Sequence, residues 1–169
     1  MSDSLPNRRS IRLPGYDYSQ NGAYFVTICT QNRECLFGDI VGNEMKLNEL
    51  GNIVNNQWKN LSIKFKNIEL DIYCIMPNHF HGIITINKLL HGGRENLAPT
   101  LGNIVALFKY QTTKQFNSVV GAWSSRPIYP KIWQRNYYEH IIRDDGDLNR
   151  VREYIIDNPL NWKNDDMFM

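Results

Sequence analysis

The sequence predicts an α+β protein: a ferredoxin-like β-α-β-β-α-β antiparallel sheet with helices on one face, followed by a C-terminal helix. Two observations lead to this prediction. Runs rich in β-branched and aromatic residues alternate with amphipathic stretches in that order along the 169 residues. The second and third of these runs are separated only by Pro77 and Asn78, so we expect them to pair as an antiparallel hairpin.

Four segments have the composition or the periodicity of β-strands. The first is rich in β-branched and aromatic residues, which favours a buried strand. In the second, apolar residues recur at every second position, so we expect the even-numbered residues from Ile68 to Cys74 to share one buried face. The predicted strands are Tyr24–Thr30, Ile68–Met76, His79–Ile86 and a segment near Ile132–Ile142.

Three segments have the periodicity of amphipathic helices. Apolar residues recur at helical spacing over Leu47–Leu61 and over Leu101–Phe116, and these two helices should cover one face of the sheet. The acidic run Asp144–Asp147 offers N-cap residues for a third helix that continues to about Asp157. Pro159 then ends it, because proline cannot continue a helix.

The domain organisation follows from these elements. We expect a basic N-terminal arm over residues 1–22 and a single domain over residues 23–169, within which Val119–Pro130 should form a loop. Hydrophobic residues make up 42% of the chain and charged residues 21%, as in an ordinary globular protein, and the net charge is only +2. No apolar run is long enough for a transmembrane helix, and the N-terminus lacks the apolar core of a signal peptide. We therefore expect a cytoplasmic protein without a membrane partner.

The cysteines indicate neither a disulfide framework nor a zinc site. They are odd in number and have no CxxC spacing, and two of them lie inside apolar runs. We expect buried free thiols at these two, and the three residues are Cys29, Cys35 and Cys74.

The segment Met76–Ile86 contains a His-x-His pair in a predicted strand. Side chains alternate between the faces of a strand, so His79 and His81 should point the same way while Phe80 points into the opposite face. Two imidazoles in this arrangement can converge on one divalent cation. On their own they could equally be hydrogen-bonded surface or core residues.

The predicted C-terminal helix contains Tyr154 and Asn158, four residues apart and therefore on one face. A tyrosine on a helix that packs against a sheet is often only a packing residue. An asparagine directly before Pro159 is also common at the end of a helix without any chemical role. Neither residue identifies a function alone.

Taken together, these features resemble the HUH endonucleases that have a single catalytic tyrosine. The closer likeness is to the REP-associated tyrosine transposases and their insertion-sequence relatives. It covers nearly the whole chain, and it rests on Tyr24–Thr27, Met76–His81, Ile132–His140 and Tyr154–Pro159, which occur in the family's order.

The resemblance implies roles for individual residues. His79 and His81 match the paired metal ligands, which would hold Mg²⁺ or Mn²⁺, and Tyr154 matches the nucleophile, which forms a 5′-phosphotyrosine and leaves a free 3′-hydroxyl. Asn158 stands where insertion-sequence members have a glutamine that completes the metal site, and it is one methylene shorter, so its ligation of the metal stays open. His140 lies in a motif typical of the REP-associated group, without a role that the sequence reveals.

The implied substrate is single-stranded DNA, with a hairpin near the cleavage site. Exposed bases can stack on aromatic rings, while cationic side chains bind the phosphates. The expected DNA-binding residues are Arg8, Arg9, Arg12, Lys109, Lys114, Arg135, Tyr138 and Arg150. The short tail after the last helix favours a monomer over a homodimer that exchanges this helix.

Three other interpretations stay open. The chain could be a non-catalytic nucleic-acid-binding module on the same scaffold, or a domesticated transposase that binds DNA without cutting it. It could also be a metal-dependent phosphodiesterase in which water attacks. Among the tyrosines, Tyr137 and Tyr138 compete with Tyr154 as nucleophile, because they lie beside Arg135 and His140.

Overall fold

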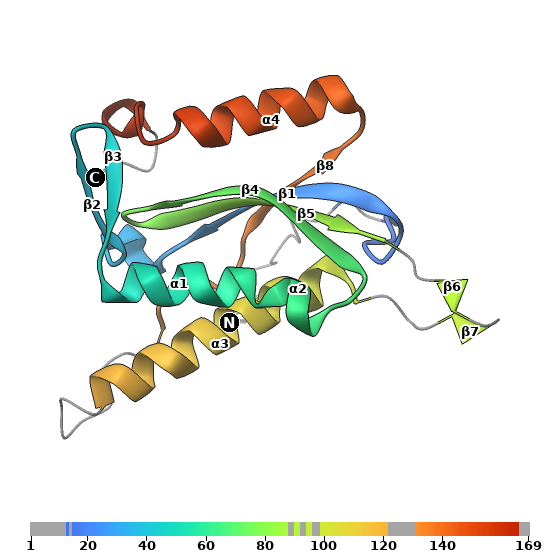
Figure 1. Ribbon diagram of the computed structural model, residues 1–169, viewed down its shortest axis with the longest axis horizontal. Helices are drawn as coiled ribbons and strands as arrows, with labels where there is room; N and C mark the ends of the chain where they lie inside the picture. The colour runs from blue at the N-terminus through green and yellow to red at the C-terminus, as the bar shows by residue number, and fades with distance from the viewer. Residues whose placement is uncertain are drawn as a thin grey trace, which may run out of the picture.

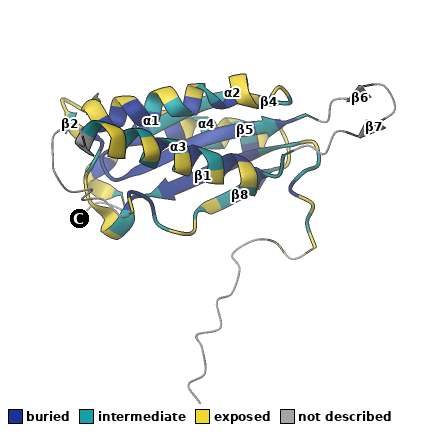
Figure 2. Cartoon of the chain, turned by 90° about the horizontal axis from the view of Figure 1, so that it is seen from below, coloured by how far each residue is buried: buried dark blue, intermediate teal, exposed yellow. Residues whose placement is uncertain are grey.

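The computed structural model describes residue 13 and residues 15–87, 90–91, 94–95, 99–121 and 131–165. The molecule has three layers, with α4 (Asp145–Asp157) on one face of a sheet and with α1 (Glu49–Lys59) and α3 (Leu101–Gly121) on the other (Figure 1). In Figure 2 the two inner strands of this sheet are largely buried, whereas the two outer strands are mostly half-buried. No described helix is both long and apolar enough to span a bilayer.

The central sheet has four strands in the order β4-β5-β1-β8, and every neighbouring pair is antiparallel. This arrangement, with α1 and α3 on one face, confirms the predicted fold class. The strands are β1 (Gly22–Cys29), β4 (Ile68–Met76), β5 (His79–Ile86) and β8 (Tyr138–Ile142).

The predicted helices lie where they were expected, and they differ from the prediction mainly in their first and last residues. The Asn48 side chain accepts a hydrogen bond from the Gly51 N–H, so the first helix begins after Asn48 rather than at Leu47. The third predicted helix begins after Asp144, whose side chain accepts from the Asp147 N–H. The helices are α1 (Glu49–Lys59), α2 (Leu61–Lys64), α3 (Leu101–Gly121) and α4 (Asp145–Asp157), with 3-10 turns η1 (Gln31–Arg33) and η2 (Trp162–Asn164).

Two other boundaries were predicted wrongly. The helix α3 continues to Gly121, so the expected loop Val119–Pro130 does not begin at Val119; residues 122–130 lie outside the described part of the chain. The last strand begins only at Tyr138, because between Ile132 and Tyr137 the backbone makes a single bridge, from Trp133 to Thr30.

Two small hairpins escaped the sequence prediction because their strands are short. In the first, β2 (Gly38–Val41) pairs with β3 (Glu44–Leu47) through a turn at Gly42 and Asn43. Both turn residues have positive φ, 59° and 64°, as a two-residue type I′ hairpin turn requires. The second pairs β6 (Leu90–His91) with β7 (Arg94–Glu95).

The main core lies between the sheet and the helices α1 and α3. Its centre is a cluster of fully buried rings in which Trp58 of α1 and Phe108 of α3 contact Phe80 of β5, with centroids 4.5 and 5.2 Å apart. Gly82 makes room for this cluster, because a Cβ atom there would lie 2.6 Å from Trp58 Cζ2. Close packing of α1 against β5 therefore requires a glycine in the middle of a buried strand.

A second, smaller core joins α4 to the other face of the sheet. Ile155 of α4 is buried against Phe25 of β1 and Ile83 of β5. A β-bulge between Leu70 and Tyr73 adds one residue to β4, and it turns Ile72 and Cys74 toward this second core. The prediction that the even-numbered residues from Ile68 to Cys74 share one face was therefore wrong, because the bulge reverses the alternation.

Candidate active site

His79 and His81 lie side by side on β5, on the face that α4 covers. Their ring centroids are 4.5 Å apart, and both side chains are buried. Phe80 between them points into the opposite core. The strand alternation predicted from the sequence is confirmed for these three residues.

The Nδ1 atom of each histidine ring lies within hydrogen-bonding distance of a neighbouring side chain. His81 Nδ1 lies 2.8 Å from Thr27 Oγ1, and His79 Nδ1 lies 2.8 Å from Asn78 Oδ1. The Asn78 amide also donates to the Arg33 carbonyl, which fixes its orientation, so the oxygen that faces His79 can only accept. His79 must therefore carry its proton on Nδ1 and present an unprotonated Nε2, the form that binds metal.

Burial keeps both imidazoles neutral. It lowers the pKa of His79 from 6.5 to about 4, although the nearby carboxylate of Asp165 acts in the opposite direction. The pKa of His81 is lowered well below its ordinary value, first by burial and then by the neighbouring His79. Within the described residues, Nε2 of each ring is buried without a hydrogen-bond partner. His79 therefore offers a free Nε2 lone pair at neutral pH, and His81 offers a second when its proton is on Nδ1, where the Thr27 hydroxyl can accept it.

Oxygen atoms from the C-terminal segment approach the same two rings. Asn158 is buried beside His79, and its Oδ1 has no hydrogen-bond partner in the part of the chain that the structure describes. Asp165 Oδ2 lies 3.8 Å from His79 Nε2, and one ligand atom from each of His79, His81 and Asp165 fits within 4.8 Å. Two imidazoles, a carboxylate and an amide oxygen form a donor set suited to a divalent cation.

Asp165 was missed in the sequence analysis. Its position depends on the 3-10 turn η2, in which Trp162 is buried with its ring 6.0 Å from the His79 ring, centroid to centroid. The Asp165 N–H donates to the Trp162 carbonyl and so closes that turn. An acidic residue after a helix end is a weak signal, because the sequence does not reveal in which direction the chain turns after Pro159.

Tyr154 presents its ring to the histidines from α4. The centroid of its ring is 5.2 Å from that of His81 and 5.9 Å from that of Phe25, and 49% of the residue is exposed. Ile155 packs into the small core and fixes the rotation of the helix. Asn158 follows one turn later. The structure thus brings together His79, His81, Tyr154 and Asn158, four residues selected from the sequence.

The competing tyrosines lie on opposite faces of the sheet. Tyr137 packs against the main core, under the Lys109 ammonium, which is 5.4 Å from its ring centroid. Tyr138 is 56% exposed and lies on the histidine face. It is paired with Thr27 of β1, and Thr27 is paired on its other side with His81. Of these two tyrosines, Tyr138 is therefore the one whose position still allows it to compete with Tyr154 as the nucleophile.

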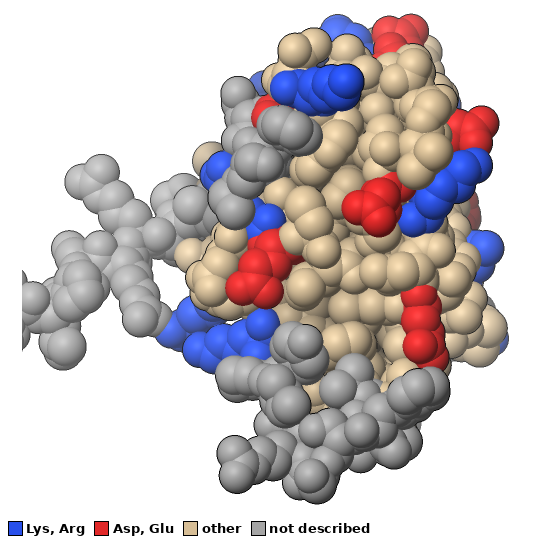
Figure 3. All heavy atoms as spheres, turned by 90° about the vertical axis from the view of Figure 1, so that its left-hand side faces the viewer, with Lys and Arg blue, Asp and Glu red and all other residues tan. Residues whose placement is uncertain are grey.

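The remaining residues expected to bind DNA are dispersed. Arg135, Tyr138 and Arg150 are exposed, whereas Lys114 lies on α3, on the other side of the sheet from the histidines. The Lys109 ammonium donates to the carbonyls of residues 134, 135 and 136. Arg8, Arg9 and Arg12 lie outside the described residues. On the side of the molecule that faces left in Figure 1, acidic side chains separate several groups of Lys and Arg (Figure 3).

His140 has a structural partner that the sequence did not reveal. Its Nε2 lies 2.8 Å from Asp147 Oδ2. Asp147 also accepts from the Arg143 N–H and from the Arg150 guanidinium, and the His140 hydrogen bond is the largest cause of its lowered pKa. These contacts attach the start of α4 to the end of β8.

The chain is similar to several known proteins. A family model described as IS200-like transposase matches residues 19–158. A Haemophilus influenzae strain Rd protein described as uncharacterized is 40% identical over 180 residues, which cover 98% of this chain and 95% of that protein. A second protein of that strain, named as a candidate REP-associated tyrosine transposase, is 29% identical over 149 residues, 85% of this chain and 73% of that protein.

One solved structure has a similar fold. It is described as a REP-associated tyrosine transposase bound to a REP hairpin, and it superposes with a TM-score of 0.59. The match covers 92% of this chain and 74% of that one, at 19% sequence identity. At this identity the likeness concerns the fold.

Proposed function

Because the chain belongs to the IS200-like transposase family, we propose that it nicks and rejoins single-stranded DNA through a covalent bond between Tyr154 and a 5′-phosphate. The observation that carries this proposal is the position of the Tyr154 ring, 5.2 Å from that of His81, beside two buried imidazole nitrogens that have no hydrogen-bond partner among the described residues. A packing tyrosine would not require unpaired ligand atoms next to it.

The residues present fit a divalent cation. It would be held by the Nε2 atoms of His79 and His81, the Asn158 oxygen and the Asp165 carboxylate. Bound there, Mg²⁺ or Mn²⁺ would supply positive charge that polarises the scissile phosphate. Thr27 and Asn78 would orient the two rings, as hydrogen-bonded partners of metal-binding histidines commonly do.

The chain's own residues account for the bond changes. The Tyr154 oxygen attacks phosphorus and loses its proton, a new O–P bond forms, and the bond from phosphorus to the 3′-oxygen breaks. The leaving oxygen takes up a proton and becomes a 3′-hydroxyl. The phosphotyrosine conserves the energy of the phosphodiester, so attack by another 3′-hydroxyl rejoins DNA without a nucleotide cofactor.

The DNA partner is proposed from the same family. A hairpin with an adjacent single strand would suit a site that one tyrosine approaches from one helix. We propose Tyr138, Arg135 and Arg150 as contacts on the described surface, with Lys114 and the N-terminal Arg8, Arg9 and Arg12 contacting the backbone farther away. Packing of α4 on its own sheet supports a monomer as the active form.

Covalent capture tests the proposal. Wild-type protein is mixed with labelled single-stranded oligonucleotides from its flanking DNA and Mn²⁺, and a denaturing gel is inspected for a protein–DNA adduct. We expect an adduct with wild type and none with Tyr154→Phe, His79→Ala or His81→Ala. Cleavage without an adduct would indicate a hydrolytic phosphodiesterase, and binding without cleavage would indicate a non-catalytic DNA-binding protein.

A further inference from the structure

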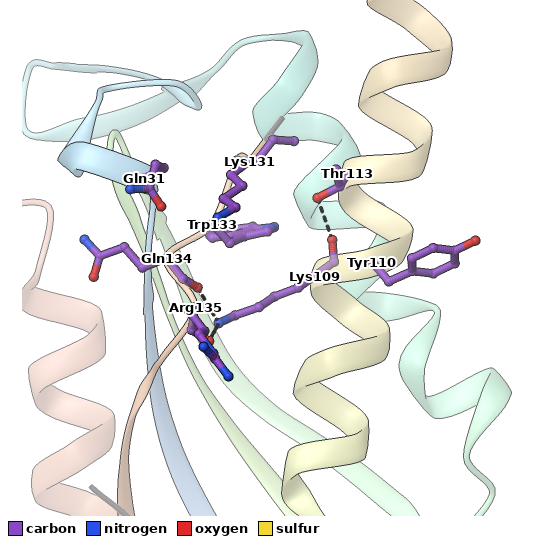
Figure 4. Close-up of a pocket in the computed structure, with 9 residues that line it drawn as sticks. Gln31, Lys109, Tyr110, Thr113, Lys131, Trp133, Gln134 and Arg135 are labelled. Atoms are coloured by element: carbon purple, nitrogen blue, oxygen red, sulfur yellow. Dashed lines mark hydrogen bonds between the residues drawn. The ribbon is translucent and has the colours of Figure 1, made fainter. Parts of the chain in front are cut away.

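A cavity of about 550 Å³ lies between α3 and the edge segment, which we define as residues 131–137 (Figure 4). The edge segment runs beside the end of β1: Trp133 bridges to Thr30, and the Gln134 N–H donates to the Cys29 carbonyl. Cys29 is paired with His79 on the next strand. The cavity therefore lies beside the end of β1, the strand next to the one that carries His79, and on the α3 side of the sheet.

Lys109 builds one wall of the cavity. Its ammonium reaches from α3 to the edge segment and donates to the carbonyls of residues 134, 135 and 136, as Figure 4 shows for the first two. These three bonds use all of its protons, so Lys109 acts as a support that shapes the segment rather than as a cation free to bind a ligand.

Trp133 provides an unused hydrogen-bond donor in this wall. Trp133 is only 5% exposed, and its indole N–H has no acceptor among the described residues. Figure 4 shows the indole projecting from the edge segment toward α3. A buried donor without a partner is destabilising, so a ligand that supplied an acceptor would recover part of that cost.

The charge of the lining selects for an anionic ligand. Among the nine described residues that line the cavity, three are cationic and none is acidic. Lys131 and Arg135 are exposed, so their charged groups can reach a ligand that enters from solvent. The volume is within the range of small-molecule sites, about 300–1,000 Å³. The lining thus combines a flat indole, a buried N–H donor and two cations, which suits a nucleotide.

We propose that this cavity holds one unpaired nucleotide of the DNA strand that the active site cuts, with a base carbonyl accepting from the Trp133 indole and a phosphate near Lys131 and Arg135. This proposal rests on the proposed function, because it assumes that single-stranded DNA passes the site. Thymine and cytosine have such carbonyl acceptors, and a base held there would help to select the position of the cut.

Binding of two matched oligonucleotides tests the proposal. Labelled dT10 and an abasic decamer with the same number of phosphates are titrated in EDTA, which prevents cleavage, and affinity is read from fluorescence anisotropy. Trp133→Phe keeps a ring against Phe37 and Phe108 but removes the N–H. We expect it to weaken dT10 binding by about fivefold to tenfold and to leave the abasic decamer unchanged.

Trp58→Phe is the matched control, because Trp58 is also buried and its indole N–H has no partner in the described part of the chain, but it lies in the main core. It should bind both decamers as the wild type does. Arg135→Ala should weaken both decamers equally, whereas Lys59→Ala, an exposed lysine of α1, should weaken neither. Thermal melting identifies variants that fail to fold.

Unchanged dT10 affinity in folded Trp133→Phe, or an equal loss in Trp58→Phe, would overturn the cavity proposal alone if wild type still forms the covalent adduct. A selective loss of dT10 binding without any adduct would retain the cavity and reject the proposed function. Failure of the wild type to bind either decamer at low salt would reject both.

Discussion

At the scale of single residues, the hydroxyl of Thr27 holds the His81 ring through a bond of 2.8 Å to Nδ1. We predict that Thr27→Val, which keeps the shape of the side chain, weakens Mn²⁺ binding by about 10-fold to 100-fold, because the ring loses its orienting partner. Calorimetric titration with Mn²⁺ measures this. Thr112→Val is the control, since Thr112 is equally buried but bonds only the Phe108 carbonyl of its own helix. Equal affinities of Thr27→Val and wild type would contradict the prediction.

Burial of His79 should make the metal-free protein sensitive to acid. Its pKa is about 4 in the folded chain against 6.5 in the unfolded chain, so only the unfolded state takes up this proton between those values. The free energy of unfolding is therefore highest above pH 6.5, and it should fall by up to about 3 kcal/mol as the pH decreases to 4. Urea unfolding in EDTA at pH 7.5 and 4.5 measures this loss, which should be smaller in His79→Gln. An equal loss in both proteins would contradict the prediction.

The site residues differ in how far the sequence could reveal them. His79 and His81 share a face because strand geometry alone decides it, and Tyr154 and Asn158 do so because helix geometry decides it. Asp165 follows no such period. Its approach to His79 depends on the packing of Trp162, which is a tertiary contact without a local signal.

At the scale of elements, α4 carries Tyr154 and is held to the sheet by few polar contacts. The Arg152 guanidinium donates to Asp71 Oδ2 at the β4 bulge, through Nε at 2.9 Å and a terminal nitrogen at 2.6 Å. The bulge that the alternation pattern concealed is thus one of the places where the helix is attached to the sheet. Sequence periodicity predicts regular strands, and an inserted residue that breaks the period is visible only in the pairing register.

We predict that Arg152→Ala slows formation of the covalent adduct by about fivefold, because a loosened α4 places the Tyr154 oxygen correctly less often. The rate is measured under single-turnover conditions with DNA in excess. Glu44→Ala removes an exposed ion pair with Lys46 on β3 and serves as the control. A wild-type rate in Arg152→Ala would show that the ion pair between Arg152 and Asp71 does not position the helix.

At the scale of the whole molecule, α4 packs on the same sheet that carries the two histidines. Ile155 of α4 packs on Phe25 and Ile83 of its own sheet, so the nucleophile and the histidines face each other within one copy. The order of elements in the sequence predicted the sheet and the face that α1 and α3 cover. It could not predict that α4 docks on its own sheet, because an amphipathic helix would fit the same surface of a second copy equally well.

We predict that two inactive variants do not rescue each other. If α4 acts within its own chain, Tyr154→Phe mixed with His79→Ala gives no adduct, because neither protein holds a complete site. An exchanged helix would combine Tyr154 of one chain with His79 of the other and restore activity in part. The mixture is incubated at high concentration before DNA and Mn²⁺ are added, and a recovered adduct would show that the helix is exchanged.

The central claim is that Tyr154 carries the DNA, and peptide mapping of the adduct tests it most directly. Trypsin cuts after Arg152 and Lys163, so Tyr154 is the one tyrosine of the peptide 153–163, while Tyr137 and Tyr138 share the peptide 136–143. After nuclease trimming, mass spectrometry locates the nucleotide. The account predicts a phosphodiester-linked nucleotide on peptide 153–163 and unmodified peptide 136–143. A nucleotide on peptide 136–143 would contradict it and move the nucleophile to Tyr138.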